Sequence, residues 1–243
     1  MQEKPIPILM FHNIGLKKDQ VFMKSLNVSK FLFFVQMLSL KILGYKGLNM
    51  TQLEKYLNGD KKGKVVGITF DDGYENNLKN AAPILKKFQF SATCYILSEN
   101  IGNKNYWDLR ENFAEIKTMD LSQIKKWISF GFEIGSHGKT HSRLSNIPTR
   151  KAEEEIFESK KQLENIFNVP IEHFCYPYGD YNREVMEIVK NAGYKTATTV
   201  NRSRVYNNDL LALPRVFITH RTYLPSFLLK ILTKYEDRKF KKN

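Results

Sequence analysis

Short β-rich runs alternate with helical patterns along the whole chain, and this alternation constrains the fold more than any other feature. Strands joined by helical crossovers pair in parallel, and such crossovers are right-handed. About seven strands in one run, with no composition break, repeat or linker, predict a single α/β domain over residues 1–243 with a (β/α)7-type barrel. The β-rich runs span residues 6–11, 65–70, 90–97, 132–136, 171–176, 195–200 and 213–219.

Helical patterns fill the intervals between these runs. Ser29 is placed to cap the first helix, which Gly44 ends. Residues 100–119 have no clear period and include Trp107, so we expect a long loop or insertion there. In a parallel barrel the chemistry lies at the C-terminal ends of the strands, so polar clusters directly after a strand are the candidates for a site. Helices are predicted over residues 29–43, 76–87, 121–130, 149–167, 182–192 and from 225 onwards.

The first polar cluster is Asp71-Asp72-Gly73, which directly follows the most β-like run of the chain. Two adjacent carboxylates raise each other's pKa because their negative charges repel. A bound cation reduces this repulsion, and so does an arrangement in which the two carboxylates have different roles. A turn in which Asp72 caps the next helix explains the same residues equally well.

The second and third clusters also follow predicted strands. His137 and His141 are four residues apart, so they reach one side of a turn and can ligate one ion, which we favour over two structural histidines. The run Tyr176-Pro177-Tyr178-Gly179 is a turn signal in any protein. It also suits a pocket wall whose backbone N–H faces a developing oxyanion.

In their order and spacing the clusters resemble the motifs of the polysaccharide deacetylases, which are carbohydrate esterase family 4 with the NodB homology domain. The family's first motif, Thr-Phe-Asp-Asp-Gly, stands unchanged at residues 69–73, and His137 and His141 match its His-Ser-x-x-His motif with Gly138 in the place of Ser. The opening run at residues 9–12, Leu-Met-Phe-His, is similar to the Leu-Met-Tyr-His start of the branch that acts on exopolysaccharides and lipid-linked sugars.

The resemblance implies a distorted barrel of about seven β/α units and a metal-dependent hydrolase that removes acetyl groups from N-acetylated sugars. Asp71 is then the catalytic base, and Asp72, His137 and His141 hold a divalent metal, with Zn²⁺ favoured over Co²⁺ or Ni²⁺. The backbone N–H of Tyr178 would face the oxyanion. The implied substrate is an N-acetylated glycan or a lipid-linked envelope sugar.

One departure from the family pattern keeps a second function open. The third motif of the family is Arg-x-Pro-Tyr, and Cys175 occupies the place of its Arg, which in relatives holds the catalytic base. Arg215, near a late strand end, is our candidate to supply that guanidinium. For the general acid we favour His220, with His12 at the end of the first strand as the competitor. The alternative function is a catalytically silent barrel that binds carbohydrate or anions.

The net charge and the two ends of the sequence lead to expectations about binding partners and location. The 38 Lys and Arg residues outnumber the 25 Asp and Glu residues, which gives a formal charge of +13, but no nucleic-acid-binding motif accompanies them and we expect no nucleic-acid partner. Residues 225–243 form a basic helix and tail that suit an anionic membrane surface. No signal peptide is visible, so we expect a cytoplasmic protein, peripheral on the inner membrane face; an exported chain whose signal had been removed would look the same. Cys94 and Cys175 are expected to be buried free thiols.

Overall fold

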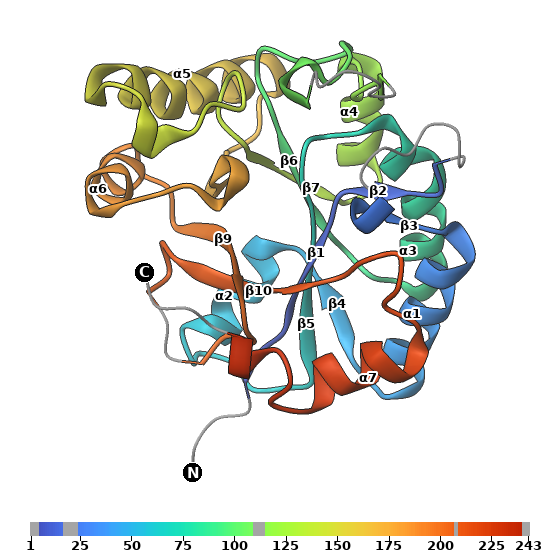
Figure 1. Cartoon of the computed structure of the whole chain (residues 1–243). Coiled ribbons are helices and arrows are strands. Elements are labelled where there is room, and N and C mark those ends of the chain that lie inside the picture. Colours follow the sequence, from blue (N-terminus) through green and yellow to red (C-terminus); the bar gives the residue numbers. More distant parts are fainter. Residues whose placement is uncertain (1–4, 17–23, 109–114, 207–208, 240–243) are drawn as a thin grey trace.

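The fold is a closed barrel of parallel strands, seen in a computed structural model that describes residues 5–16, 24–108, 115–206 and 209–239. The strands follow one another in the order β1-β10-β9-β8-β7-β6-β5, and direct pairing of β1 with β5 closes the ring (Figure 1). The predicted barrel in a single domain is therefore confirmed. The described strands are β1 Ile8–Phe11, β2 Asn13–Ile14, β3 Asn27–Val28, β4 Lys46–Leu48, β5 Val65–Phe70, β6 Thr93–Ile96, β7 Glu133–Ser136, β8 His173–Cys175, β9 Thr196–Arg202 and β10 Leu213–Phe217.

Helices surround the barrel and shield its outer face (Figure 1). The Ser29 hydroxyl accepts a hydrogen bond from the Leu32 N–H at 3.1 Å and so begins the first helix where the sequence predicts it. The helix expected over residues 76–87 begins instead with a π-helical turn, Asn77–Ala81, and Pro83 then stands in the first turn of α3, where its missing N–H costs no helical hydrogen bond. The described α-helices are α1 Lys30–Ile42, α2 Met50–Leu57, α3 Ala82–Phe88, α4 Leu121–Ser129, α5 Thr149–Phe167, α6 Arg183–Asn191 and α7 Leu224–Leu232.

Four short elements were not expected from the sequence: β2, β3, β4 and α2. The strand β4 pairs with the first half of β5, whereas β6 pairs with its second half, so β4 lies outside the closed ring. A Cβ at Gly47 would meet the Phe90 ring at 2.6 Å, which explains why a glycine stands in this strand. With three residues and a central glycine, β4 is too short to show an alternating pattern.

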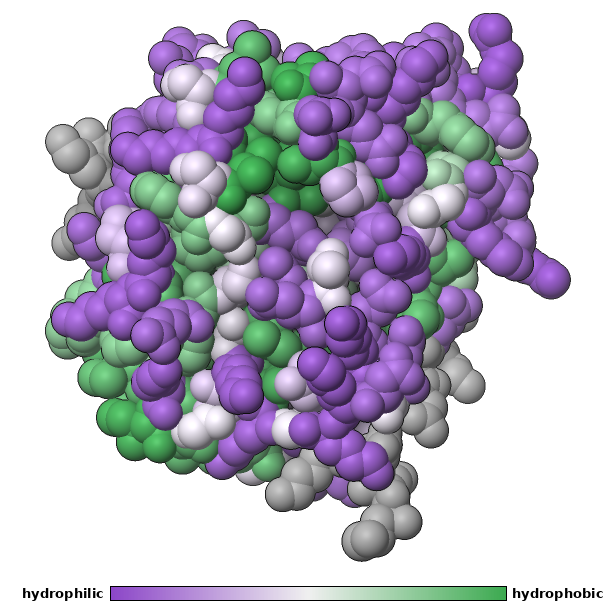
Figure 2. Space-filling view, turned by 180° about the vertical axis from the view of Figure 1, so that it is seen from behind, coloured by the Kyte–Doolittle hydropathy of each residue, from purple (hydrophilic) through white to green (hydrophobic). Residues whose placement is uncertain are grey.

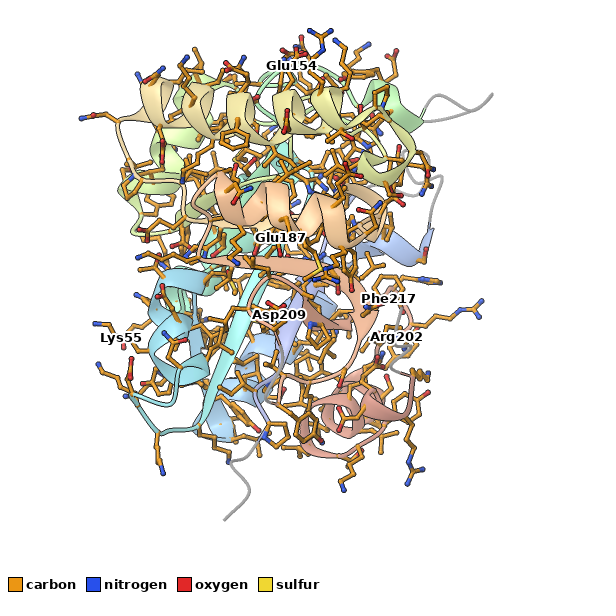
Figure 3. All side chains as sticks on the ribbon, turned by 90° about the vertical axis from the view of Figure 1, so that its left-hand side faces the viewer. Lys55, Glu154, Glu187, Arg202, Asp209 and Phe217 are labelled. Atoms are coloured by element: carbon orange, nitrogen blue, oxygen red, sulfur yellow. The ribbon has the colours of Figure 1, made fainter. Side chains whose placement is uncertain are left out.

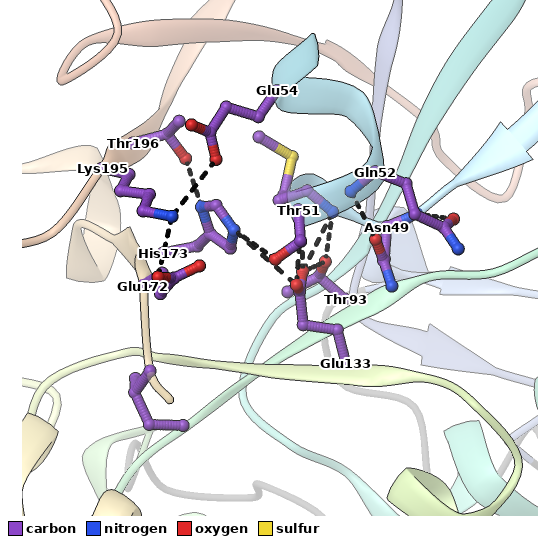
Figure 4. A network of polar contacts seen from close by, with 12 residues as sticks. Asn49, Thr51, Gln52, Glu54, Thr93, Glu133, Glu172, His173, Lys195 and Thr196 are labelled. Atoms are coloured by element: carbon purple, nitrogen blue, oxygen red, sulfur yellow. Dashed lines mark hydrogen bonds and ion pairs between the residues drawn. The ribbon is translucent and has the colours of Figure 1, made fainter. Parts of the chain in front are cut away.

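The helix α2 closes the N-terminal end of the barrel through a polar network (Figure 4). The Glu133 carboxylate accepts hydrogen bonds from the first two N–H groups of α2 at 3.0 and 3.2 Å and from the Thr93 hydroxyl. The buried His173 ring contacts the Thr51 hydroxyl through Nε2 at 3.0 Å and the Thr196 hydroxyl through Nδ1 at 2.9 Å. All these groups have partners within the protein, and the network ties α2 to the N-terminal ends of β6, β7, β8 and β9.

The segment after α7 is fastened to the end of β9 and the residues directly after it by two ion pairs. Arg202 donates two hydrogen bonds of 2.8 Å to the Glu236 carboxylate, and the Arg204 side chain donates two, of 3.2 and 2.6 Å, to Asp237. Figure 3 shows Arg202 beside Phe217, where β9 and β10 end, and the guanidinium lies 5.8 Å from the centre of that ring. The two acidic residues of the basic tail are therefore neutralised within the fold.

One face of the molecule shows how polar and apolar side chains are distributed on it. Figure 2 shows a rear face that is largely hydrophilic and carries separate apolar patches. Among the helices of the described ranges, none combines the length and the apolar composition needed to cross a membrane.

Candidate active site

Three strands bring the polar clusters of the sequence to one end of the barrel. Asp71 and Asp72 follow β5, His137 follows β7, and Arg215 lies within β10. All four side chains are buried. Because the C-terminal ends of parallel strands share one face, residues that are up to 144 positions apart meet there.

One buried oxygen lies between two imidazoles. Oδ1 of Asp72 is 3.3 Å from Nε2 of His137 and 3.4 Å from Nε2 of His141. These contacts do not have the geometry of hydrogen bonds, so the oxygen is a buried acceptor without a hydrogen-bond partner. A carboxylate oxygen that faces two ring nitrogens is the donor set of a divalent cation, and the residues present therefore fit such an ion.

The pKa values of Asp72, His137 and His141 are shifted by burial and by the charges of their neighbours. Burial acts to raise the pKa of Asp72, but the two histidines beside it hold that pKa well below its usual range. Burial acts to lower the pKa of His137, yet Cys175 and Asp72 raise it well above its ordinary value, whereas burial lowers the pKa of His141. A proton on His137 competes with a cation, so cation binding here weakens as the pH falls.

Neighbouring groups orient the ligand loop. Nδ1 of His137 lies 2.7 Å from the Cys175 carbonyl oxygen; a donated N–H there leaves Nε2 free for a cation. The buried Glu155 carboxylate accepts hydrogen bonds from the N–H groups of Lys139 and Thr140 at 2.9 and 3.0 Å. Glu155 on α5 thus fixes the loop between the two histidines.

Two of the three candidate ligands have strained backbones. Asp72 has φ of +70° and His141 has φ of +64°, in the left-handed region that side-chain-bearing residues rarely adopt. Such strain persists only where the surroundings fix it, and it is typical of functional sites.

The second carboxylate, Asp71, is held by a two-pronged ion pair. Nη1 and Nη2 of Arg215 donate to its two oxygens at 2.6 and 2.7 Å. Nε of Arg215 donates to the Thr199 carbonyl at 2.9 Å, and Nη2 also lies 3.3 Å from Sγ of Cys175. Burial acts to raise the pKa of Asp71, but Arg215, with smaller effects of His12 and His137, holds it below its ordinary value.

The structure therefore places a guanidinium against Asp71, although Cys175 occupies the expected arginine position. The Cys175 thiol is fully buried against that guanidinium, and both cysteines are free and buried, as predicted. The sequence suggests Arg215 only as a candidate, because β10 follows Asp71 by more than 140 residues.

The two candidate proton donors differ in position. Nε2 of His12, directly after β1, is 3.7 Å from Oδ2 of Asp71. Within the described residues, His220 makes no hydrogen bond or ion pair with Asp71 or Asp72, and its Nδ1 is buried without a hydrogen-bond partner. Tyr178 lies beside the candidate ligands, with its ring centre 4.3 Å from that of His141.

Two residues near the site were not singled out as functional from the sequence. Trp107 stacks on His141 with ring centres 4.9 Å apart. Glu155 lies on the buried face of α5, in register with Ala152, Ile156 and Ser159. An acidic residue on the apolar face of a helix is a signal that could have identified Glu155, whereas no pattern in residues 100–119 identifies Trp107.

Comparison with known protein sequences agrees with the site. A family model described as polysaccharide deacetylase matches residues 58–197. YxkH of Bacillus subtilis (strain 168), a polysaccharide deacetylase by name, is 32% identical in an alignment of 222 residues that covers 89% of this chain and 73% of that protein. A poly-β-1,6-N-acetyl-D-glucosamine N-deacetylase of Staphylococcus aureus (strain MSSA476) is 29% identical over 69% of this chain, and the match spans 60% of that protein.

Solved structures show the same fold. The deacetylase PplD of Streptococcus pyogenes, solved in complex with acetate, aligns with a TM-score of 0.83 and 26% identity over 94% of this chain and 99% of that chain. A polysaccharide deacetylase from Bacillus cereus aligns with a TM-score of 0.79 and 31% identity over 94% of this chain and 69% of that chain.

The parallel barrel, the carboxylate between two imidazoles and the carboxylate beside an arginine, taken with the family match, assign the chain to the hydrolases of the carbohydrate esterase class. Within that class, the chain belongs to the polysaccharide deacetylase family, enzymes that remove acetyl groups from N-acetylated sugars. The family resemblance predicted from the sequence motifs is confirmed.

The Asp71–Arg215 pair generates a prediction about stability. Arg215→Met leaves a buried carboxylate without its partner, so the free energy of unfolding is expected to fall by about 3–5 kcal/mol. Adding Asp71→Asn removes the uncompensated charge and should recover part of that loss. Urea unfolding of both single variants and the double variant at pH 7 measures the coupling, with the exposed Arg221→Met as a control that changes stability by less than about 0.5 kcal/mol.

The pH dependence checks the same pair. Because the folded pKa of Asp71 lies below its unfolded value of about 3.9, its stabilisation is complete above that pH and is lost as the pH falls through the folded pKa. Purely additive effects of Arg215→Met and Asp71→Asn on the free energy of unfolding would contradict the coupling between the two side chains.

Proposed function

We propose that this protein is a divalent-cation-dependent N-deacetylase acting on N-acetylated sugars of an envelope polysaccharide or of its lipid-linked precursor. The observation that carries the proposal is the unpartnered Asp72 oxygen between two imidazoles, next in the chain to the arginine-paired Asp71. The name of the Staphylococcus aureus relative, a deacetylase of poly-β-1,6-N-acetyl-D-glucosamine, supports the substrate class.

The cation site consists of Asp72, His137 and His141, one oxygen and two nitrogen donors. This mixed donor set favours Zn²⁺, with Co²⁺ or Ni²⁺ as substitutes. A divalent cation held by three protein ligands supplies polarisation of the acetyl carbonyl and acidification of a water molecule.

The remaining proton transfers fall to the chain's own residues. Asp71 is kept ionised by Arg215, so a carboxylate oxygen accepts the proton of the attacking water. The two-pronged contact with Arg215 also fixes the direction in which that carboxylate faces. The backbone N–H of Tyr178 is our candidate to stabilise the oxyanion.

For the proton that the leaving amine needs, the geometry favours His12 over the sequence-based choice of His220. Nε2 of His12 lies 3.7 Å from the Asp71 carboxylate, whereas His220 makes no hydrogen bond or ion pair with either carboxylate among the described residues. An acid and a base that share one pocket can act on opposite sides of the same acetamide.

Removing a ligand and removing the base should have different effects. His137→Ala is expected to abolish both cation content and activity, whereas Asp71→Asn should retain the cation and lower kcat by roughly 10²–10⁴. Elemental analysis and acetate release from an N-acetylglucosamine oligomer measure the two properties, with the exposed Asp60→Asn as a control. A His137→Ala variant with a full equivalent of tightly bound Zn²⁺ would contradict the site. Wild-type protein that holds Zn²⁺ but releases no acetate from any glycan would favour the silent binding barrel.

The choice between the two histidines is tested by substitution and chemical rescue. His12→Ala is expected to keep its cation, to lose roughly 10²–10⁴ in kcat and to regain part of it when imidazole is added. His220→Ala should keep its activity within about twofold. The reverse pattern would restore His220 as the general acid.

We also propose peripheral attachment to an anionic membrane surface. Lys230 does not contribute, because it is buried and donates to Glu236 and to the Phe217 carbonyl. Lys234 and Lys239 are exposed, and they follow α7, whose Leu229 and Leu232 are exposed by 43% and 46%. The helix α1 packs against α7 (Figure 1) and carries two further exposed apolar residues, Phe31 and Ile42. The cytoplasmic location expected from the sequence stays a prediction.

Cosedimentation with vesicles that contain phosphatidylglycerol tests this attachment. Each lysine near an anionic leaflet contributes about 1 kcal/mol, so Lys234→Gln with Lys239→Gln should weaken binding about 30-fold at low salt. Lys55→Gln with Lys61→Gln, exposed lysines of the α2 region, is the matched control. Deleting the tail is a poor test, since it would leave Arg202 and Arg204 without their carboxylate partners. Absence of binding at low salt would contradict the proposal.

A further inference from the structure

The two histidines of the cation site are held in different ways. His137 has the usual arrangement, in which the ring nitrogen that faces away from the site meets a carbonyl oxygen. The corresponding Nδ1 of His141 is buried and has no hydrogen-bond partner. Its backbone, with φ of +64°, is strained and does not by itself set the direction of the ring. Something other than a hydrogen bond must orient the imidazole of His141.

Two aromatic rings enclose that imidazole. The indole of Trp107 lies nearly parallel to it, with ring centres 4.9 Å apart and an interplanar angle of 24°. The phenol ring of Tyr178 approaches at 4.3 Å with an angle of 73°, an edge-to-face contact. Both geometries are favourable for aromatic pairs, and together they restrict rotation of the ring about its bond to Cβ.

The segment that carries Trp107 is fastened to the ligand loop. The Tyr106 hydroxyl donates to the Thr140 carbonyl at 3.1 Å, one residue before His141. The Tyr178 hydroxyl donates to the Trp107 carbonyl at 3.5 Å, which links the two sides of the enclosure. Arg143 adds a contact of 4.0 Å over the Tyr178 ring. The aromatic pair is therefore part of a connected arrangement around His141.

The base of this segment is also anchored. Lys104 pairs with Lys117, and Tyr74 pairs with Thr118, as isolated antiparallel bridges. Tyr74 directly follows the Asp71-Asp72-Gly73 turn, so the described residues between β6 and α4, 97–108 and 115–120, are tied to both ligand-bearing segments. This anchoring gives Trp107 a fixed position relative to the cation site.

We propose that Trp107 and Tyr178 are positioning residues for the candidate ligand His141, and that their stacking orients its ring as the carbonyl of Cys175 orients His137. The inference rests on the proposed function only in taking His141 as a cation ligand. It assigns a role to the stretch between β6 and α4, which the sequence shows only as an irregular loop.

Cation affinity of the metal-free protein tests the proposal without measuring activity. Outer partners of ligating histidines are worth 10–100-fold in affinity, so Trp107→Leu, which keeps apolar bulk but removes the flat ring, should raise the Kd for Zn²⁺ by about 10-fold or more. Trp107→Phe keeps a stacking ring and should stay within about threefold of wild type. Phe157→Leu, a partly exposed aromatic of α5, is the matched control and should leave the Kd unchanged.

Two measurements give the readout. Competition with a chromophoric chelator yields the Kd for Zn²⁺, and the visible absorption of the Co²⁺-loaded protein reports a change in ligand geometry in the Leu variant. Thermal melts of the metal-free variants verify that each is folded. A folded Trp107→Leu variant with wild-type affinity and an unchanged Co²⁺ spectrum would overturn the proposal, and so would equal losses in the Leu and Phe variants.

Failure of the proposed function gives a different result. In that case wild-type protein binds no Zn²⁺, or His137→Ala leaves its Kd unchanged. Normal Zn²⁺ binding that depends on His137 but not on the Trp107 ring would reject only the role of Trp107.

Discussion

The buried guanidinium of Arg215 is the interaction on which the site end of the barrel depends. It is fully buried, and its nitrogens reach Asp71 after β5, the Thr199 carbonyl on β9 and the Cys175 thiol on β8. The strand β1 lies between β10 and β5, so this side chain spans the place where the ring closes. A buried charge is tolerated only when it is paired, and each ion therefore requires the other.

That pair also separates the tasks of two adjacent carboxylates. Asp71 faces an arginine and Asp72 faces two imidazoles, although the two residues are neighbours in the chain. The left-handed backbone of Asp72 lets the two side chains reach different partners. The pKa of Asp71 is lowered by Arg215 and that of Asp72 by the two histidines, so both buried carboxylates stay ionised although they lie next to each other.

Residues outside the barrel strands hold the ligand loop and the ring of His141 in place. Glu155 holds the loop between the two histidines from the side of α5, and Trp107 reaches His141 from the stretch between β6 and α4. At the opposite end, Glu133 and His173 hold α2 across the barrel mouth (Figure 4). Polar networks therefore occupy both ends of the barrel, but only the site end contains an unpartnered ligand oxygen among the described residues.

The sequence by itself determined the barrel, most of its strands and helices, and the two motifs that supply Asp71, Asp72, His137 and His141. It could do so because the alternating pattern and the strand-end clusters are local in the chain. Short elements such as β4 left no such pattern.

Tertiary structure alone decided that Arg215 meets Asp71, that His12 rather than His220 lies beside that carboxylate, and that Trp107 stacks on His141. Each of these contacts joins segments more than 30 residues apart, and no local pattern encodes which distant side chain fills a given space. Only closure of the barrel brings them within a few ångströms of one another.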